Sequence, residues 1–320
     1  LFSNPDMVHL SLLRNHARWA VFLRGLKYVV VDECHYYRGI FGSNVAMVLR
    51  RLLRLCERYR GAGDAGPTVI FASATTAAPG QTAAELIGRP VAEVTDDGSP
   101  QGARTIALWE PELRHDIHGE NGAPVRRSAA GEAARMMADL VAEGARTLTF
   151  VRSRRSAELT ALGARTRLAD IAPRLRGTVA SYRAGYLAED RRALERALSD
   201  GELRGLAATN ALELGIDISG LDAVVLAGFP GTVASFWQQA GRCGRRGQGA
   251  LVLLVARDDP LDTYLVHHPQ ALLGKPVERV VTDPTNPYVM GPQLLCAATE
   301  LPLTTDEISA WKAESVVRAL

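Results

Sequence analysis

Two adjacent carboxylates, Asp32 and Glu33, follow the apolar run YVVV at residues 28–31. A strand that is covered on both faces is apolar throughout, and its carboxyl end opens onto the crevice where open α/β sheets bind ligands. Neighbouring carboxylates repel each other unless they share a cation, and Mg²⁺ typically takes one or two carboxylates together with substrate phosphates. The pair therefore predicts a nucleotide-phosphate site, with Asp32 on Mg²⁺ and Glu33 polarising the attacking water. Taken alone, the pattern is equally typical of a strand that ends in solvated acids.

Two small hydroxyl residues, Ser73 and Thr75, stand at the end of the next apolar run, residues 68–74. If both strands are parallel, these hydroxyls lie on the same sheet edge as Asp32 and can hydrogen-bond to the acidic pair. The alternative is a cap between a strand and a loop.

The segment ATNALELGID (208–217) follows another apolar run and begins a predicted helix at Thr209, with Gly215 and Asp217 in the following turns. An amide-rich helix start suits a phosphate oxygen, and Asp217 suits a ribose hydroxyl. Helix capping by Thr209 or Asn210 is the alternative.

The segment WQQAGRCGRRGQG (237–249) combines glycines with two arginines, Arg242 and Arg245, three residues apart. This spacing places both guanidinium groups on one side of a helix end, and the glycines keep the turns free of side chains. Forked guanidinium groups can stabilise charge on a transferring phosphoryl group. A solvated basic turn is the alternative, and the five-residue pattern of Gln238, Gly241, Arg242, Gly244 and Arg245 disfavours it.

The elements that must position these residues alternate between short apolar runs and amphipathic segments, as in parallel βαβ units. Strands are predicted at 26–32, 68–74, 147–151, 177–182, 205–209, 222–228 and 250–256. Helices are predicted at 44–60, 129–143, 153–169, 188–200 and 232–242. A polar stretch at 95–102 and a break near 267–276 divide the chain into 1–100, 101–270 and a helical tail, 271–320, which is too short to hold its own core.

The composition is that of a globular protein, with 47% hydrophobic and 22% charged residues. Because the net charge is only +2, nucleic-acid binding would depend on local basic clusters such as VRSRR at 151–155. The four cysteines are scattered without a Cys-x-x-Cys pair, which disfavours a zinc site or a disulfide framework. No membrane span or signal peptide is visible, and we expect a cytoplasmic monomer.

Together these patterns fall in the order and spacing of helicase motifs. The residues Asp32-Glu33-Cys34-His35, Ser73-Ala74-Thr75, Thr209 to Asp217, and Gln238 to Arg245 resemble motifs II, III, V and VI of superfamily II helicases. SNPDM (3–7) resembles motif Ib, which touches the DNA backbone. The segments at 96–100, 108–111, 182–186 and 286–298 resemble more narrowly the YprA-like, RecQ-related group of DNA helicases, of the SftH and MrfA type.

The resemblance implies tandem RecA-like αβα lobes with parallel sheets, the first lobe incomplete, followed by the start of a small, winged-helix-like helical segment. The implied activity is ATP- and Mg²⁺-dependent, three-prime to five-prime translocation on single-stranded DNA with duplex unwinding, in DNA repair. Single-stranded and tailed duplex DNA are the implied partners. A duplex translocase that does not separate strands, and a non-hydrolysing nucleic-acid-binding half-motor, are the alternatives.

The resemblance also assigns roles to individual residues. In nucleotide chemistry these are Asp32 for Mg²⁺, Glu33 as the catalytic carboxylate, Arg242 and Arg245 for the γ-phosphate, Asp217 for the ribose, and Gln238 and Gly215 for the nucleotide. His35, Ser73 and Thr75 would couple hydrolysis to strand movement. The residues expected along the DNA are Asn4, Arg152, Arg154, Tyr182, Arg183 and Thr209.

One departure from the family pattern is the phosphate loop. The 320 residues contain no G-x-x-x-x-G-K-[ST] segment, whose backbone and lysine hold the β and γ phosphates. The pair Gly274-Lys275 is followed by Pro276 and comes after the second domain, so it cannot serve. We therefore expect that the amino-terminal part of the first lobe is missing from this sequence.

Overall fold

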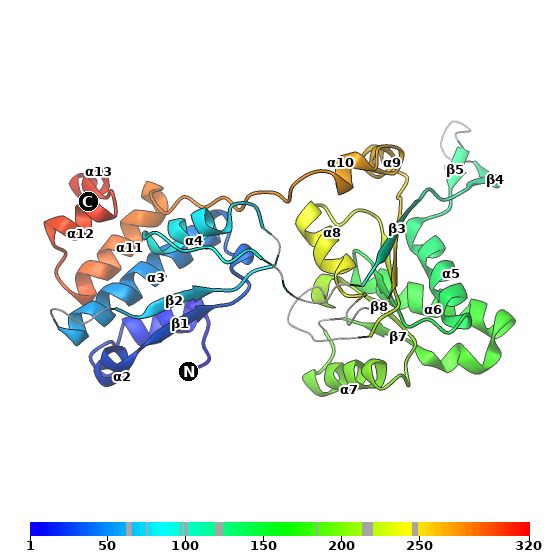
Figure 1. Cartoon of the computed structure of the whole chain (residues 1–320), viewed down its shortest axis with the longest axis horizontal. Helices are drawn as coiled ribbons and strands as arrows, with labels where there is room; N and C mark the ends of the chain where they lie inside the picture. The colour runs from blue at the N-terminus through cyan, green and yellow to red at the C-terminus, as the bar shows by residue number, and fades with distance from the viewer. Residues whose placement is uncertain are drawn as a thin grey trace. The chain divides into compact units, whose positions relative to one another are not determined.

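The chain folds into two units (Figure 1). A computed structural model describes residues 1–61, 66–74, 76–96, 98, 102–118, 124–183, 185–212, 220–244 and 249–320. Unit 1 comprises Leu1–Asp96 together with Glu278–Leu320, and unit 2 comprises Asp97–Val277. Both ends of the chain therefore fold together, although the whole of unit 2 lies between them in the sequence. Each helix among the described residues is too short or too polar to cross a bilayer.

Unit 2 is built on a six-stranded, all-parallel sheet with the order β3-β10-β9-β6-β8-β7. The strands are β3 (Arg104–Trp109), β6 (Thr147–Phe150), β7 (Val179–Tyr182), β8 (Gly205–Ala208), β9 (Ala223–Ala227) and β10 (Ala250–Val255). Every residue of β6, β8 and β9 is buried. Helices cover both faces of the sheet, which explains why β8 and β9 carry no polar side chain and why Thr147 and Thr149 of β6 are buried.

The helices of unit 2 divide between the two faces of the sheet (Figure 1). They are α5 (Ala129–Ala142), α6 (Arg154–Ile171), α7 (Ala188–Ser199), α8 (Val233–Ala240), α9 (Pro260–His267) and α10 (Gln270–Leu273). On one face α5 and α6 pack against Ala207 and Val225, and on the other Leu198 of α7 and Phe236 of α8 pack against Leu206 and Leu226. Ser128, Ser153 and Thr232 each cap the helix that follows them.

All seven predicted strands and all five predicted helices are confirmed, with small shifts at their ends. The sequence pattern did not predict β3, an edge strand with partly exposed residues, or the antiparallel hairpin of β4 (Leu113–His118) and β5 (Pro124–Arg126). It also missed α4 (Pro79–Ile87). None of the β3 residues is buried, whereas every residue of the central strands β6, β8 and β9 is.

Unit 1 contains the parallel pair β1 (Tyr28–Val31) and β2 (Thr68–Phe71). One face packs against α3 (Gly39–Arg60) and α4 through Val31, Ala46 and Leu86. The amino-terminal elements are α1 (Pro5–Met7), the π-helical η1 (Val8–Leu13) and α2 (Ala20–Gly25). They pack on α3 through Leu12, Leu13, Leu23, Val48, Leu52, Leu55 and Cys56.

The opposite face of the β1–β2 pair exposes apolar side chains. Tyr28, Val30 and Ile70 are 63%, 64% and 44% exposed. Parallel sheets normally have both faces covered. In the described part of unit 1, this face of the β1–β2 pair is therefore uncovered, whereas other parallel sheets bury it.

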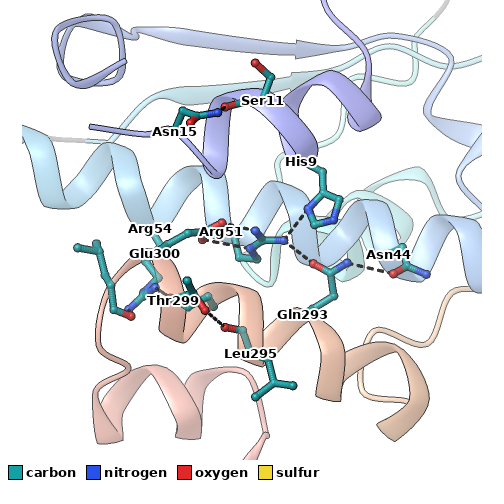
Figure 2. Close-up of polar contacts among 12 residues, drawn as sticks. His9, Ser11, Asn15, Asn44, Arg51, Arg54, Gln293, Leu295, Thr299 and Glu300 are labelled. Atoms are coloured by element: carbon teal, nitrogen blue, oxygen red, sulfur yellow. Dashed lines mark hydrogen bonds and ion pairs between the residues drawn. The ribbon is translucent and has the colours of Figure 1, made fainter. Parts of the chain in front are cut away.

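The carboxyl-terminal segment of unit 1 is held by a buried arginine on α3. This segment forms α11 (Pro287–Glu300), α12 (Thr305–Ala310) and α13 (Glu314–Ala319). Figure 2 shows the Arg51 guanidinium donating to Gln293 Oε1 (2.7 Å), His9 Nδ1 (3.0 Å) and the Glu300 carboxylate (3.1 Å to Oε2). Because arginine only donates, His9 Nδ1 must accept, and burial together with the Arg51 charge lowers the pKa of His9.

A second arginine on α3, Arg54, binds the end of α11. It donates to the carbonyl oxygens of Ala297 (2.8 Å), Leu301 (2.9 Å) and Pro302 (2.7 Å), and to Glu307 Oε1 (2.5 Å). Ala297 O also accepts from Leu301 N (3.0 Å), so the guanidinium adds to this C-cap bond and also bonds the carbonyl oxygens of Leu301 and Pro302, which follow the helix. The tail, which the sequence suggests is too short for a core of its own, thus packs against the core of unit 1.

We expect Arg51→Ala to lower the free energy of unfolding of unit 1 by about 3 to 5 kcal/mol, because Glu300 would stay buried without its cation. The two side chains are only 2% and 5% exposed. Arg89→Ala is the matched control, since the Arg89–Glu57 pair is 47% and 48% exposed and such pairs contribute roughly 0 to 1 kcal/mol. Urea unfolding, with unit 1 identified by hydrogen exchange of α3, measures both. Equal effects would mean that burial adds nothing to the Arg51 pair.

Candidate functional site

The Asp32-Glu33 pair follows β1 directly, beside the end of β2. The backbone ladder continues past both strands, because Ala72 N donates to Val31 O (2.9 Å) and Cys34 N donates to Ala72 O (3.1 Å). Glu33 has a left-handed backbone, with φ 50° and ψ 41°, and its N–H donates to Asp32 Oδ1 (2.9 Å). Such a conformation costs a side-chain-bearing residue about 1 to 2 kcal/mol and is often found at functional sites.

His35 and Ser73, two of the residues assigned to coupling, lie together at this edge. His35 Nδ1 is 3.1 Å from Ser73 Oγ and 3.5 Å from Glu33 Oε2. Burial raises the pKa of the Cys34 thiol, and a hydrogen bond with Ser73 opposes that effect. The third residue, Thr75, lies outside the described residues. The ends of β1 and β2 are thus linked through side chains as well as through the backbone.

The carboxylates at this edge have the chemistry of a magnesium site. Asp32 is exposed and Glu33 is partly exposed, so both can be reached from solvent. Their oxygen atoms suit Mg²⁺, which uses one or two protein carboxylates and completes its shell with phosphate and water oxygens. The described residues include no group of three or more His, Cys, Asp or Glu side chains arranged to hold a metal.

Three neighbouring strands of unit 2 end in residues assigned to DNA binding. Because β6, β8 and β7 are adjacent and parallel, Arg152, Thr209 and Arg183 follow them along one sheet edge. Arg152 and Arg154 are exposed at the start of α6, whereas Thr209 is buried. Arg183 is 4.9 Å above the ring of Tyr186. In unit 1, Asn4 is exposed and caps α1 through Met7 N (2.8 Å).

Tyr182 requires a correction, because the structure removes it from this edge. Its side chain is in the core, 1% exposed, and its hydroxyl donates to Glu195 Oε1 (2.7 Å). Burial and this hydrogen bond raise the pKa of Tyr182 to about 12. A buried ring cannot stack on a base. The partly exposed Tyr186 is the aromatic residue of this segment that a DNA strand could reach.

The sequence contains a signal that separates these two tyrosines. Tyr182 belongs to an apolar strand, whose side chains face a covered sheet, whereas Tyr186 follows the strand and lies beside Arg183. The Tyr186 hydroxyl is 2.8 Å from Ser181 Oγ. An aromatic ring outside the strand and next to an arginine was therefore the better candidate for contact with a nucleic acid.

The arginine-rich segment after α8 lies at the other edge of the same sheet. α8 runs from the end of β9 back to the start of β10. After α8, the backbone of Cys243 forms an isolated parallel β-bridge with Leu221, just before β9. Gln238 is partly exposed, and Arg242 is 8% exposed. Gly215, Asp217 and Arg245 lie outside the described residues. Arg152 and Arg242 thus lie at opposite edges of the unit 2 sheet, Arg152 exposed and Arg242 buried.

Comparison with known proteins places this arrangement in a helicase family. Residues 132–247 match the family described as the Helicase conserved C-terminal domain. The ATP-dependent helicase YprA of Bacillus subtilis is 38% identical over 309 residues, covering 96% of this chain and 40% of YprA. The ATP-dependent helicase HRQ1 of Saccharomyces cerevisiae is 41% identical over 328 residues, covering 100% of this chain and 30% of HRQ1.

A crystal structure of the DUF1998 helicase MrfA bound to DNA and AMPPNP matches with a TM-score of 0.86 at 38% identity, over 95% of this chain and 41% of MrfA. The fold is therefore that of RecA-like helicase lobes, which confirms the predicted fold class. The chain belongs to the superfamily II helicases of the YprA and Hrq1 type. It spans less than half the length of each of these relatives.

The correction at Tyr182 can be tested directly. Tyr182→Phe should lower the free energy of unfolding of unit 2 by about 0.5 to 1.5 kcal/mol, through loss of the hydrogen bond to Glu195, and should leave affinity for single-stranded DNA unchanged. Tyr186→Ala should show the reverse, with weaker DNA binding and little change in stability. Fluorescence anisotropy and urea unfolding provide the two measurements. A loss of DNA affinity in Tyr182→Phe alone would restore the original assignment.

Proposed function

We propose that this chain belongs to the motor of an ATP-dependent DNA helicase that moves three-prime to five-prime on single-stranded DNA and separates the duplex, in DNA repair. The observation that carries the proposal is the pairing of Glu33, in a strained backbone, with His35 and Ser73 at the ends of β1 and β2. The kinship with YprA and HRQ1, both named ATP-dependent helicases, supports it.

On the nucleotide side, we assign Asp32 to Mg²⁺ and Glu33 to the attacking water. Bound ATP would supply the phosphoryl group that is transferred to this water. Arg242 and Arg245 would stabilise the charge on that group, since a forked guanidinium can bind two phosphate oxygens at once. Asp217, Gln238 and Gly215 would bind the rest of the nucleotide.

On the nucleic-acid side, we assign Asn4, Arg152, Arg154, Arg183 and Thr209 to the DNA backbone. The row of Arg152, Thr209 and Arg183 along one sheet edge supports this assignment, because a single strand is bound by tracks of positive charge. The neighbouring structure of MrfA was solved with DNA bound. Tyr186 replaces Tyr182 as the aromatic residue of this track.

A complete ATP site needs a phosphate loop, which these 320 residues do not contain. We propose that further polypeptide completes the first lobe and covers the exposed apolar face of the β1–β2 pair. The exposure of Tyr28, Val30 and Ile70 supports this, since parallel sheets normally have two covered faces. We call this chain joined to such a loop the parent helicase. A half-motor that binds nucleic acid without hydrolysis is the second candidate for the chain alone.

Glu33→Gln in the parent helicase should abolish DNA-stimulated ATP hydrolysis and leave ATP binding within about twofold, because the amide keeps the shape but cannot polarise water. The control is Glu57→Gln, which removes an exposed carboxylate of the same unit outside the site. The chain of 320 residues should show no ATPase activity of its own. Turnover near the parent rate in Glu33→Gln would exclude Glu33 as the catalytic carboxylate.

Replacing Arg152 and Arg154 by glutamine should weaken the binding of single-stranded DNA about equally for all sequences. The slope of log affinity against log salt should fall by roughly one unit per lost contact. The matched control is the replacement of Arg174 and Arg176 by glutamine, which removes the same charge. Both arginines are exposed and precede β7 at the opposite edge of the sheet. Equal losses in both double variants would indicate a general charge effect rather than a track.

A further inference from the structure

A buried carboxylate lies at the carboxyl edge of the unit 2 sheet, where the chain leaves β9 and β10. Asp262 belongs to α9 and is 0% exposed. Its Oδ2 accepts from Phe229 N (3.1 Å), Arg257 N (2.9 Å) and Arg257 Nε (3.0 Å), and its Oδ1 accepts from Arg257 Nη2 (2.9 Å). Burying a carboxylate is costly unless it is paired and hydrogen-bonded, and these bonds meet that requirement.

The Arg257 guanidinium joins the ends of the two strands. Its Nη2 also donates to Phe229 O (3.1 Å), so Asp262 and Arg257 together bind both the N–H and the carbonyl of Phe229. Gly228 has φ +97°, and a Cβ atom there would lie 2.2 Å from Arg257 Nε, so alanine would displace the Arg257 side chain. We call Arg257 and Asp262, with the backbone of Gly228 and Phe229, the α9 clamp.

The α9 clamp holds the segment from which α8 begins. Only two residues separate Phe229 from Thr232, the N-cap of α8, whose side chain accepts from Ser235 N (3.1 Å). α8 has eight residues, about two turns, and Arg242 comes directly after its C-cap. Because the hydrogen-bonded turns of so short a helix keep their shape, the position of its first residue determines where Arg242 lies.

We propose that Asp262 and Arg257 are positioning residues for ATP hydrolysis, because the α9 clamp fixes the start of α8 and thereby the place of Arg242 at the opposite sheet edge. The inference rests on the proposed function, in which Arg242 stabilises charge on the transferred phosphoryl group. Neither residue of the clamp touches the nucleotide. Since a misplacement of about 1 Å can cost roughly 100-fold in rate, a loosened clamp should slow hydrolysis without removing a contact to the ligand.

Arg242 lies between two attachments of the chain to the sheet. The α9 clamp comes before α8, and the backbone bridge of Cys243 with Leu221 comes after it. Between them, Phe236 of α8 is 0% exposed and packs in the core. Loosening the clamp should therefore leave α8 folded on the sheet and change only its alignment, so we expect the effect in the rate of hydrolysis rather than in ligand binding.

The test is a double-mutant cycle between Asp262→Asn and Arg242→Gln in the parent helicase, with single-turnover ATP hydrolysis, ATP affinity, DNA affinity and melting temperature measured for each variant. Asp262→Asn keeps the side-chain shape but removes the charge and one acceptor. It should lower the hydrolysis rate about 10- to 100-fold, with both affinities within about twofold of the parent. Arg242→Gln should lower the rate by about 10³-fold or more. Because the clamp acts through Arg242, Asp262→Asn should lower the rate no further in the Arg242→Gln background.

Gly228→Ala loosens the clamp from its backbone side and should reproduce the loss of rate, so the test stays decisive if Asp262→Asn does not fold. The matched control is Glu132→Gln. Glu132 belongs to α5, on the other face of the sheet from α8, is 3% exposed and accepts from Arg135 Nε (3.3 Å). This variant also neutralises a buried, arginine-bound carboxylate of unit 2. It should lower the melting temperature and leave the hydrolysis rate at the parent level.

The inference is overturned if folded Asp262→Asn hydrolyses ATP at the parent rate, or loses the same factor in the Arg242→Gln background as in the parent. In either case the clamp is merely structural, and an equal loss of rate in Glu132→Gln has the same meaning. If Arg242→Gln itself keeps the parent rate, the role of Arg242 in the proposed function fails, and the inference fails with it. The rate of Arg242→Gln therefore separates the two failures.

Discussion

Parallel pairing of strands is the constraint from which the candidate site follows. A chain that adds a parallel strand must return along a crossover, so the carboxyl ends of the strands collect at one edge. This places Asp32 beside Ser73 in unit 1, and Arg152 beside Thr209 in unit 2. The same constraint sends α8 back across the sheet and leaves Arg242 at the opposite edge. The residues assigned to DNA and the arginine assigned to the γ-phosphate therefore lie at opposite edges of the unit 2 sheet.

In unit 1 a single helix, α3, organises the remaining structure. One side of α3 covers β1 and β2, and its apolar residues also receive the amino-terminal helices. Arg51 and Arg54 hold the carboxyl-terminal helices through buried guanidinium groups that each donate to several partners. Buried ion pairs are costly to break, so they fix where the tail packs. Asp32, which follows β1, and the carboxyl-terminal helices thus belong to the same unit, unit 1.

The sequence predicted the helices and strands that are determined by the pattern of neighbouring residues. Continuous apolar runs revealed the central strands, and the spacing from Asp32 to Ser73 fitted two parallel neighbours. The strand β3, none of whose residues is buried, was missed, and Tyr182 was assigned to the DNA through the family resemblance although it ends a strand that the sequence predicts. The docking of Arg51 on Glu300 could not be predicted, since it joins residues far apart in the sequence through side-chain geometry alone.

The central claim is that this chain belongs to a motor that separates DNA strands. The most direct measurement is ATP-dependent unwinding by the parent helicase of duplexes that carry a three-prime tail, a five-prime tail or no tail. The account predicts separation of the three-prime-tailed duplex alone, with no separation when ATP is omitted. DNA-stimulated hydrolysis without separation of any duplex would contradict it and identify a translocase that moves on DNA without opening it.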